Sequence, residues 1–507
     1  MTHSWKAIVV AIITAVSAPV AEADTRDHVN VAAPWEISGP DPATDGFIFL
    51  RMGVMETLVD ASETGDLMPG LAIGWDVSED ELEWRFDLRE AAFHDGTTLT
   101  GDAVALALSR AAAQPGPLEE APLDDVGVDG DTVVISLTRP FAALPAVLAH
   151  SSTVILAPAA FDGDGNVVAP IGTGPFEVTE IAPPQTLETA RFEDYWGAPP
   201  TIASASYLAS KRAETRALMA ESGDADLVFT LDPSGYKRLG QIDQVEAVAV
   251  AIPRVMLLKV NAGHPAMSTP AARRALSLAI DRQGIAAGIT RFPEAAATQL
   301  FPPILSAWHD PTLPALAYDP EEAKALLTKE GWMPGEDGIL TRDGERFSLT
   351  LRTFPDRPEQ PLVAAAIQDQ WRAIGVELEV SVSNYSEIPA GHQDGSLEVA
   401  LFARNYGLTP DPIGTVQSDF PVGGSDWGAM GWDAPAVSEA VAQIAATADE
   451  AVRVPLIKEV TAALHAEMPL IPLVWYQHTV AYAGGLEDVI IDPLERDYGL
   501  DKIRWVE

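Results

Sequence analysis

The segment GGSDWG places a serine among small residues, the setting of a nucleophile that attacks a carbonyl group. Counted from Gly423, Ser425 occupies the serine position of Gly-x-Ser-x-Gly, a strained turn that exposes the hydroxyl. That motif needs a second small residue two positions after the serine, and Trp427 stands there. The segment therefore predicts a glycine-rich loop in preference to an acyl-transfer site.

Other catalytic patterns are equally incomplete. Ser234 and Lys237 form Ser-x-x-Lys, but neither Ser-Asp-Asn nor Lys-Thr-Gly follows. The histidines show no metal-ligand spacing, and the 507 residues contain no cysteine. The sequence predicts no catalytic residue, no metal ligand and no cofactor, although a secreted hydrolase stays open as an alternative function.

The composition of the chain excludes two classes of binding partner. The chain has 74 acidic and 32 basic side chains, a formal charge of −42, and 47% hydrophobic residues. Such a charge repels nucleic acid and anionic membrane surfaces, so neither is an expected partner. The length and the apolar content are enough for a large core divided among about three units.

The N-terminus predicts export. Lys6 precedes an apolar run from Ala7 to Val16, and an Ala-x-Ala site ends at Ala23. This is the pattern of a signal peptide over residues 1–23, cleaved before Asp24, and the apolar run is too short to span a bilayer. Without a cysteine no lipid can be attached, so the predicted location is free in the periplasm.

The remaining pattern is that of an α/β protein. Asp319 and Thr269 are each followed by proline, which predicts two helix starts. A helix ending near Gly375 runs into VELEVSV, where apolar and polar residues alternate as in a strand. The segment 132–137, TVVISL, is a second predicted strand. In IGTGPFEVTE, the two glycines predict positive φ angles or a close backbone approach.

Seven segments in this order resemble the peptide/nickel class of ABC-transporter solute-binding proteins, solute-binding protein family 5. They are the region 55–108, IGTGPFEVTE, DYWGAPP, LKVNAGHP, RRALSLAIDR with YDPEEAKALL, and MPLIPLVWYQH. The resemblance covers nearly all of the chain after residue 23. It implies the periplasmic substrate-binding component of an ABC importer, with no enzymatic activity.

The resemblance also implies the architecture. The expected fold is two-lobed, hinged and class II-like, with an extra subdomain on the first lobe. Lobe I is expected over 24–260 with the inserted subdomain, lobe II over 265–475, and a C-terminal return to lobe I over 480–507. The hinge is expected near 260–263 and 476–480. The expected partners are a small solute and an inner-membrane permease complex, and the expected state is a monomer.

The solute is not fixed by the resemblance. Peptide binders of the family carry an aspartate where RNYGLTPDP has Leu408, so the chain is closer to the nickel-binder branch, with an aromatic at Tyr406. It departs from that branch as well, because Pro410 replaces a tyrosine and no arginine stands in AAAQPGPLEE or HSSTVILAP. Peptide-like solutes, opines and metal chelates all remain open.

The candidate ligand-binding residues combine suitable chemistry with the expected position at the cleft. The aromatic rings could stack on a solute, the arginines could bind a carboxylate, and Asp411 could bind an amine. For each residue the alternative is an ordinary role in the core, in a salt bridge or in a solvated loop. The candidates are Trp35, Phe47, Arg51, Arg404, Asn405, Tyr406, Asp411 and Trp427.

Overall fold

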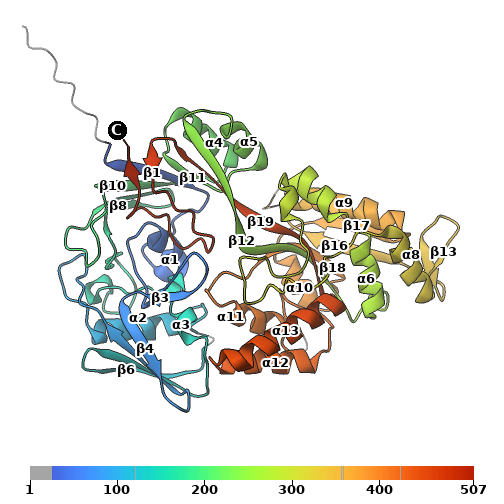
Figure 1. Ribbon diagram of the computed structural model, residues 1–507, viewed down its shortest axis with the longest axis horizontal. Coiled ribbons are helices and arrows are strands. Elements are labelled where there is room, and N and C mark those ends of the chain that lie inside the picture. The colour runs from blue at the N-terminus through green and yellow to red at the C-terminus, as the bar shows by residue number, and fades with distance from the viewer. Residues whose placement is uncertain (1–25, 120, 356, 358, 423, 507) are drawn as a thin grey trace, which may run out of the picture.

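The computed structural model describes residues 26–119, 121–355, 357, 359–422 and 424–506. The predicted signal peptide lies outside these ranges. The described part forms two lobes joined by a long sheet (Figure 1). None of its helices is both long and apolar enough to span a bilayer.

One ten-stranded sheet runs through both lobes. Two of its strands, β12 and β19, are the longest and lie next to each other at the crossing between the lobes (Figure 1). In spatial order the strands are β17 (Glu377–Val382), β16 (Ser348–Thr353), β18 (Val399–Asn405), β12 (Val245–Val260), β19 (Leu470–Ala483), β11 (Leu227–Phe229), β1 (His28–Ala33), β10 (Ser204–Ala209), β9 (Thr186–Arg191) and β8 (Phe176–Ala182).

The first lobe carries a second, four-stranded sheet of order β4-β5-β7-β6. We propose that this sheet belongs to the expected extra subdomain. Its strands are β4 (Ala72–Val77), β5 (Glu83–Leu88), β6 (Leu123–Asp129) and β7 (Thr132–Leu137). The short strands elsewhere are β2 (Val59–Ala61), β3 (Leu67–Pro69), β13 (Met333–Pro334), β14 (Leu340–Arg342), β15 (Glu345–Arg346), β20 (Leu486–Glu487) and β21 (Arg504–Trp505).

The first-lobe helices are α1 (Pro42–Arg51), α2 (Gly101–Ala112), α3 (Leu144–Val147), α4 (Ala213–Ser222) and α5 (Pro233–Leu239). The second-lobe helices are α6 (Pro270–Leu278), α7 (Arg282–Ile285), α8 (Pro320–Lys329), α9 (Glu359–Ala373), α10 (Glu387–Gln393), α11 (Ile413–Asp419), α12 (Pro435–Ala446) and α13 (Glu450–Glu467). The fold is the predicted two-lobed α/β arrangement.

Local sequence rules account for the helix ends. The Asp319 carboxylate accepts a hydrogen bond from the Glu322 amide, and the Thr269 hydroxyl accepts one from the Ala272 amide. These side chains satisfy amide groups that have no partner inside the first turn. Strand β7 occupies the predicted residues 132–137. Both helix starts and this strand are confirmed.

The glycines of IGTGPFEVTE serve a close approach of two chain segments. Neither is among the glycines with positive φ, so the close backbone approach is the property of glycine that is used here. A Cβ atom on Gly172 would lie 2.2 Å from the Val54 carbonyl oxygen, and one on Gly174 would lie 2.2 Å from the Gly53 carbonyl oxygen. The corner therefore presses the start of β8 against the end of α1.

The two lobes are in contact on the side of the molecule that carries the four-stranded sheet. One apolar cluster includes Leu144 and Val147 of α3 as well as Val441 and Ile444 of α12. The amide of Ala142 also donates to the Ala445 carbonyl oxygen at 2.9 Å. The lobes are thus held together by burial of apolar surface, which favours a closed arrangement.

The strand pairing suggests where the lobes rotate. The register between β12 and β19 shifts between Ala251 and Val255, opposite Gln477 and Trp475. Because ladder hydrogen bonds are interrupted at such an irregularity, we propose that the hinge lies there. This places it nearer the N-terminus than the predicted linker at 260–263, and next to the predicted linker at 476–480.

Candidate functional site

A cleft of about 530 Å³ lies between the lobes, beside the crossing strands. Trp35 and Asp232 belong to its first-lobe wall, and Phe292 and Phe354 belong to its second-lobe wall. Tyr476 of β19 lies between these walls. A cleft of this size and apolar character is typical of sites for small organic molecules.

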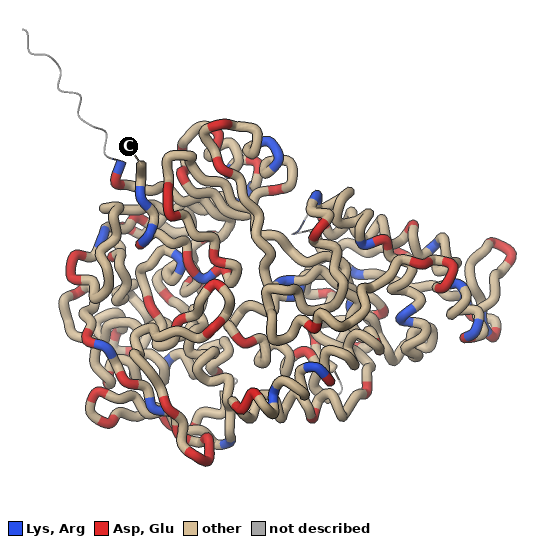
Figure 2. Tube along the Cα trace, in the orientation of Figure 1, with Lys and Arg blue, Asp and Glu red and all other residues tan. Residues whose placement is uncertain are grey.

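The cleft has an excess of cations in a strongly acidic protein. Its lining contains four Lys or Arg residues and three Asp or Glu residues, whereas acidic side chains exceed basic ones by 74 to 32 in the chain. Acidic residues are spread along the chain in both lobes (Figure 2). The charged lining residues are Lys211, Arg216, Arg254, Arg357, Asp232, Glu359 and Glu495.

Three of the four cations have partners. Lys211 pairs with Glu36 at 2.8 Å, and Arg216 donates to backbone carbonyl oxygens of the first lobe. Arg254 pairs with Glu495 at 2.7 Å. Arg357 forms no ion pair with any acid in the described part of the chain.

The ring of Tyr476 lies near the guanidinium groups of two arginines of the cleft, Arg357 and Arg254. The guanidinium carbon of Arg357 lies 5.1 Å from the ring centroid, and that of Arg254 lies 6.0 Å from it. The Tyr476 hydroxyl donates to Glu359 at 2.5 Å. Burial and the Glu359 carboxylate raise the pKa of Tyr476, so the phenol stays protonated. The aromatic face positions the guanidinium groups without neutralising them.

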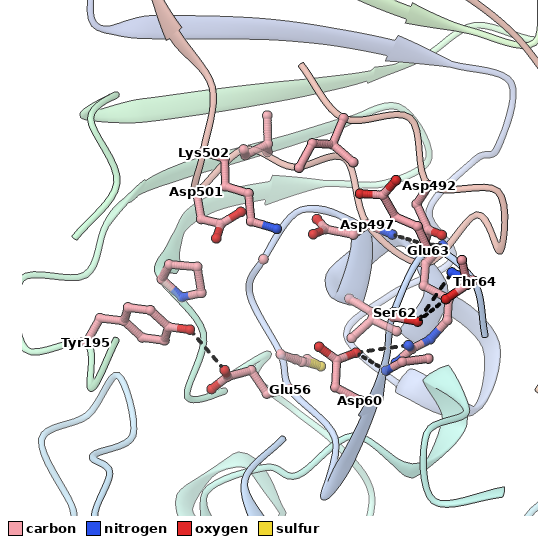
Figure 3. A pocket seen from close by; sticks show the side chains of 18 residues that line it. Glu56, Asp60, Ser62, Glu63, Thr64, Tyr195, Asp492, Asp497, Asp501 and Lys502 are labelled. Carbon is pink, nitrogen blue, oxygen red and sulfur yellow. Dashed lines mark hydrogen bonds and ion pairs between the residues drawn. The ribbon is translucent and has the colours of Figure 1, made fainter. Parts of the chain in front are cut away.

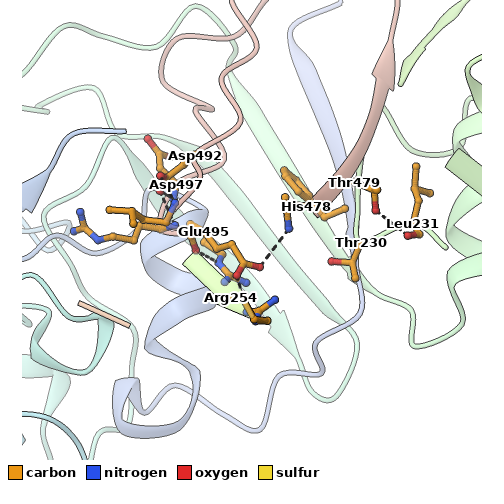
Figure 4. A network of polar contacts seen from close by, with 12 residues as sticks. Thr230, Leu231, Arg254, His478, Thr479, Asp492, Glu495 and Asp497 are labelled. Atoms are coloured by element: carbon orange, nitrogen blue, oxygen red, sulfur yellow. Dashed lines mark hydrogen bonds and ion pairs between the residues drawn. The ribbon is translucent and has the colours of Figure 1, made fainter. Parts of the chain in front are cut away.

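The C-terminal tail fixes Arg254 through Glu495 (Figure 4). One Glu495 carboxylate oxygen accepts from Arg254, and the other lies 3.3 Å from Nδ1 of His478. The Glu495 carbonyl oxygen accepts from Nε of Arg51 at 2.5 Å. Burial alone would raise the pKa of Glu495, but Arg254 and His478 hold it well below its usual value. This carboxylate therefore ties the tail to both crossing strands.

Of the sequence candidates, Trp35 lines the cleft. The guanidinium carbon of Arg51 lies 4.2 Å from its ring centroid, and Phe47 meets it edge-on with a centroid distance of 6.1 Å. Arg51 is 8% exposed and Phe47 is half-buried. The structure thus places Arg51 and Phe47 behind Trp35, as supports of its ring.

The candidates in RNYGLTPDP have internal partners and do not line this cleft. Arg404 donates to the Asp419 carboxylate through Nε and Nη2, at 2.9 and 2.6 Å. Tyr406 is fully buried, with its ring 5.0 Å from that of Phe301. The Asn405 side chain accepts from the Gly407 amide at 2.9 Å. Their proposed contacts with a solute remain predictions.

The last two candidates also lie away from the cleft. Asp411 forms an ion pair with Arg453 and accepts from the Ile413 amide at the start of α11. Trp427 packs edge-on against Phe402 and borders a shallow hollow with His392 and other residues of the second lobe. The core and salt-bridge alternatives describe this segment well.

A buried lysine that the sequence did not single out organises the same segment. Lys259 is 0% exposed, and its amino group donates to the carbonyl oxygens of Ser425 and Asp426 at 2.6 and 2.9 Å. Its Nζ also lies 3.1 Å from Nδ1 of His392. Burial lowers the pKa of Lys259 to about 7. Lys259 therefore fixes the position of the loop before Trp427.

Sequence reasoning missed Arg254, Arg357, Tyr476 and Glu495. Tyr476 lies within the family marker MPLIPLVWYQH and in the predicted hinge segment 476–480, but no contact with a solute was predicted for it. The other three stand in segments without a motif, and only the fold brings them together. Arg254 lies in the interior of β12, where it stands beside the proline of the apolar run VAVAIPRVMLL.

Comparison with known proteins assigns the chain to a family. The family model of bacterial extracellular solute-binding proteins, family 5, matches residues 66–427. The nickel-binding periplasmic protein of Escherichia coli K12 is 26% identical over 96% of both chains. The dipeptide-binding protein of the same strain is 24% identical over 86% of both chains.

A solved structure confirms the fold. NikA from Brucella suis, in complex with Fe(III)-EDTA, superposes with a TM-score of 0.86 at 23% identity, covering 94% of this chain and all of that one. The two relatives are named as binding proteins, which supports the interpretation as a binding protein and does not support the hydrolase. The chain belongs to the bacterial extracellular solute-binding proteins of family 5, the substrate-binding components of ABC importers.

Proposed function

We propose that this receptor captures a small anionic organic solute in the cleft beside β12 and β19. The observation that carries the proposal is Arg357, a cation held against Tyr476 without an acidic partner among the described residues. A buried or half-buried guanidinium favours a carboxylate, which it binds through two parallel hydrogen bonds. The excess of cations in the cleft favours the same class of solute.

The lining gives each part of such a solute a partner. Arg357 binds a carboxylate of the solute. Glu495 holds Arg254 near the same Tyr476 ring, and in this position Arg254 binds a second acidic oxygen of the solute. The rings of Trp35 and Phe354 offer apolar faces for the body of the solute. Contacts from both lobes make binding favour the closed arrangement, because only differential contacts shift that equilibrium.

Among the solutes left open by the sequence, opines and metal chelates of polycarboxylates match this chemistry. A peptide would also need an acceptor for its ammonium group. Leu408, the position at which peptide binders carry an aspartate, is 45% exposed and lies outside the cleft lining. A carboxylate-bearing solute without a free terminal amine is therefore favoured.

We also propose that residues 1–23 direct export, that the mature protein acts as a periplasmic monomer, and that it delivers the solute to an ABC permease. The periplasmic location of the relatives supports this proposal. Intact mass of protein recovered from the periplasm should correspond to a start at Asp24. Light scattering should give the mass of one chain. A retained N-terminus or a dimer would refute the respective part.

A thermal-shift panel tests the solute class. Citrate, EDTA with and without nickel, an opine, a dipeptide and a diamine should be compared at equal concentration and low salt. The proposal expects the melting temperature to rise with carboxylate-rich compounds and the effect to shrink at high salt. A rise with the dipeptide or the diamine alone would contradict it.

A further inference from the structure

The C-terminal tail places one buried acidic side chain at the proposed hinge. Glu495 lies in the tail loop, residues 492–498, and its side chain is 8% exposed. Its φ angle is 57°, in the left-handed region that residues other than glycine seldom adopt. Such a conformation persists only where the surrounding structure imposes it. The fold of the tail therefore fixes the direction in which this carboxylate points.

The tail loop is held to the first lobe by contacts that do not use the Glu495 side chain. The amide of Glu495 donates to the Asp492 carbonyl oxygen at 3.0 Å, and its carbonyl oxygen accepts from Nε of Arg51. The Asp492 carboxylate accepts from the Arg496 amide at 2.7 Å. Arg496 also pairs with Asp60 at 2.9 Å, beside a cavity of about 470 Å³ in the first lobe (Figure 3). The tail loop is thus a part of the first lobe.

The Glu495 carboxylate reaches from this loop to a strand of the second lobe. It accepts from Nη2 of Arg254 at 2.7 Å (Figure 4). Arg254 lies within the interrupted part of β12, residues 252–254, where the register with β19 shifts. It pairs with Asn405 of β18, so it belongs to the part of the sheet that continues into the second lobe. The ion pair therefore connects the two lobes across the proposed hinge.

The second oxygen of Glu495 faces the other crossing strand. It lies 3.3 Å from Nδ1 of His478. His478 pairs with Val250 of β12, and the carbonyl oxygen of the next residue, Thr479, accepts from the Thr230 amide at 2.8 Å. These contacts place this part of β19 in the first lobe. One carboxylate therefore contacts the crossing strands on both sides of the register shift.

We propose that Glu495 is a latch that restrains the rotation of the lobes about the crossing strands. Rotation at 252–254 moves Arg254 relative to the tail loop, so the ion pair forms only over a limited range of lobe angles. The pair is formed in this structure, in which the lobes are in contact. The latch therefore favours the closed arrangement before a solute binds.

The surroundings of the ion pair make it suited to this role. The Arg254 side chain is 17% exposed and that of Glu495 is 8% exposed, so solvent screens the pair less than an ion pair on the surface. Loss of one member leaves a largely buried charge without its partner, which is unfavourable. The proposal rests on the proposed hinge, and it holds whichever solute the cleft binds.

The distance between two labels, one on each lobe, tests the latch. The chain has no cysteine, so Leu106→Cys in α2 and Val454→Cys in α13, both at exposed positions, would each carry a spin label. Both helices contribute to the apolar cluster that joins the lobes, so opening lengthens the distance. Without solute, Glu495→Gln should raise the ratio of long to short distances roughly threefold or more.

An unchanged ratio would overturn the proposal, and so would a wild type that shows only the long distance. Neither result affects the proposed solute class, because no solute takes part in the measurement. Glu487→Gln is the matched control, since it removes a carboxylate from an exposed ion pair of the same tail with Arg504. It should leave the ratio unchanged.

A second variant separates the latch from a general role in folding the tail. Asparagine tolerates a positive φ angle, so Glu495→Asn keeps the backbone of the loop while its shorter, uncharged side chain loses the ion pair with Arg254. It should raise the ratio as Glu495→Gln does. Amide hydrogen exchange should show the loop 492–498 as protected as in the wild type. A raised ratio that appears only together with loss of this protection would refute the latch.

Discussion

An arginine and a tyrosine occur together in two regions of this molecule, with opposite consequences. In the second-lobe segment 404–427, Arg404 is held by Asp419 and Tyr406 is fully buried. In the cleft, Arg357 lies against Tyr476 and has no acidic partner in the described chain. The difference is the basis of the proposed site: residue type is the same in both regions, and only in the cleft does the arginine lack an acidic partner among the described residues.

The Asp419 carboxylate accounts for the internal pairing of the segment 404–427. Its side chain is 0% exposed, and burial raises its pKa while Arg404 and Tyr406 lower it. Lys259 adds a second cation near the same carboxylate. Removing one member of such a group leaves an unpaired buried charge, which is strongly destabilising.

The largest expected effect is on stability, in the segment 404–427. Tyr406→Ala should lower the free energy of unfolding by about 3–5 kcal/mol, the usual cost of deleting a buried aromatic ring. Thermal unfolding followed by tryptophan fluorescence measures it. Tyr318→Ala, at a tyrosine that is 53% exposed, is the control and should change little. A stable Tyr406→Ala protein that has lost solute binding would restore Tyr406 as a ligand contact.

The next effect is on binding, in the cleft. Arg357→Gln should weaken the binding of a carboxylate solute at least tenfold, because a hydrogen bond between two charged groups contributes about 1.5–3 kcal/mol. Calorimetry with the strongest solute of the panel measures it, and the melting temperature without solute should stay constant. Arg346→Gln, on the exposed second-lobe surface, is the matched control. Equal losses in both variants would indicate a general charge effect.

A smaller effect distinguishes two half-buried tryptophans, Trp35 and Trp427. Trp35→Ala should weaken solute binding by about 0.5–1.5 kcal/mol, or roughly three- to tenfold, through loss of the ring face. Trp427→Ala should leave the affinity unchanged, because Trp427 borders a different hollow. Titrations of both variants with one solute test the comparison, and the reverse order would move the site to the segment 404–427.

A pH dependence of stability is expected in the segment 404–427 as well. Burial lowers the pKa of Lys259 to about 7 from its usual 10.5. Between these values the unfolded chain binds a proton that the folded chain does not, so Lys259 makes stability rise as the pH increases from 7 to 10.5. Lys259→Met should reduce this slope, and Lys324→Met, at an exposed lysine, should not. Parallel melting curves of Lys259→Met and the wild type at pH 7 and 9 would refute the shift.

The sequence predicted those features of the fold that depend on neighbouring residues. The caps at Asp319 and Thr269 and the alternating strand 132–137 follow from local hydrogen bonding and side-chain periodicity. The role of the glycines at 172 and 174 does not depend on neighbouring residues. They are required by the close approach of a segment that is distant in the sequence, and not by a turn.

The candidate site was less predictable because it depends on distant partners. Trp35 was recognised by its ring and its early position. The pairing of Arg404 with Asp419, and of Glu495 with Arg254, joins residues 15 and 241 positions apart, and no local pattern reports either. Only the folded structure shows which arginine has no acidic partner among the described residues.

The most direct test of the central claim is the crystal structure of the protein with the strongest anionic solute of the panel. The account predicts that the solute lies between the lobes, with a carboxylate within hydrogen-bonding distance of Arg357 and its body against Trp35. A solute bound against the segment 404–427, with Arg357 facing solvent, would contradict it.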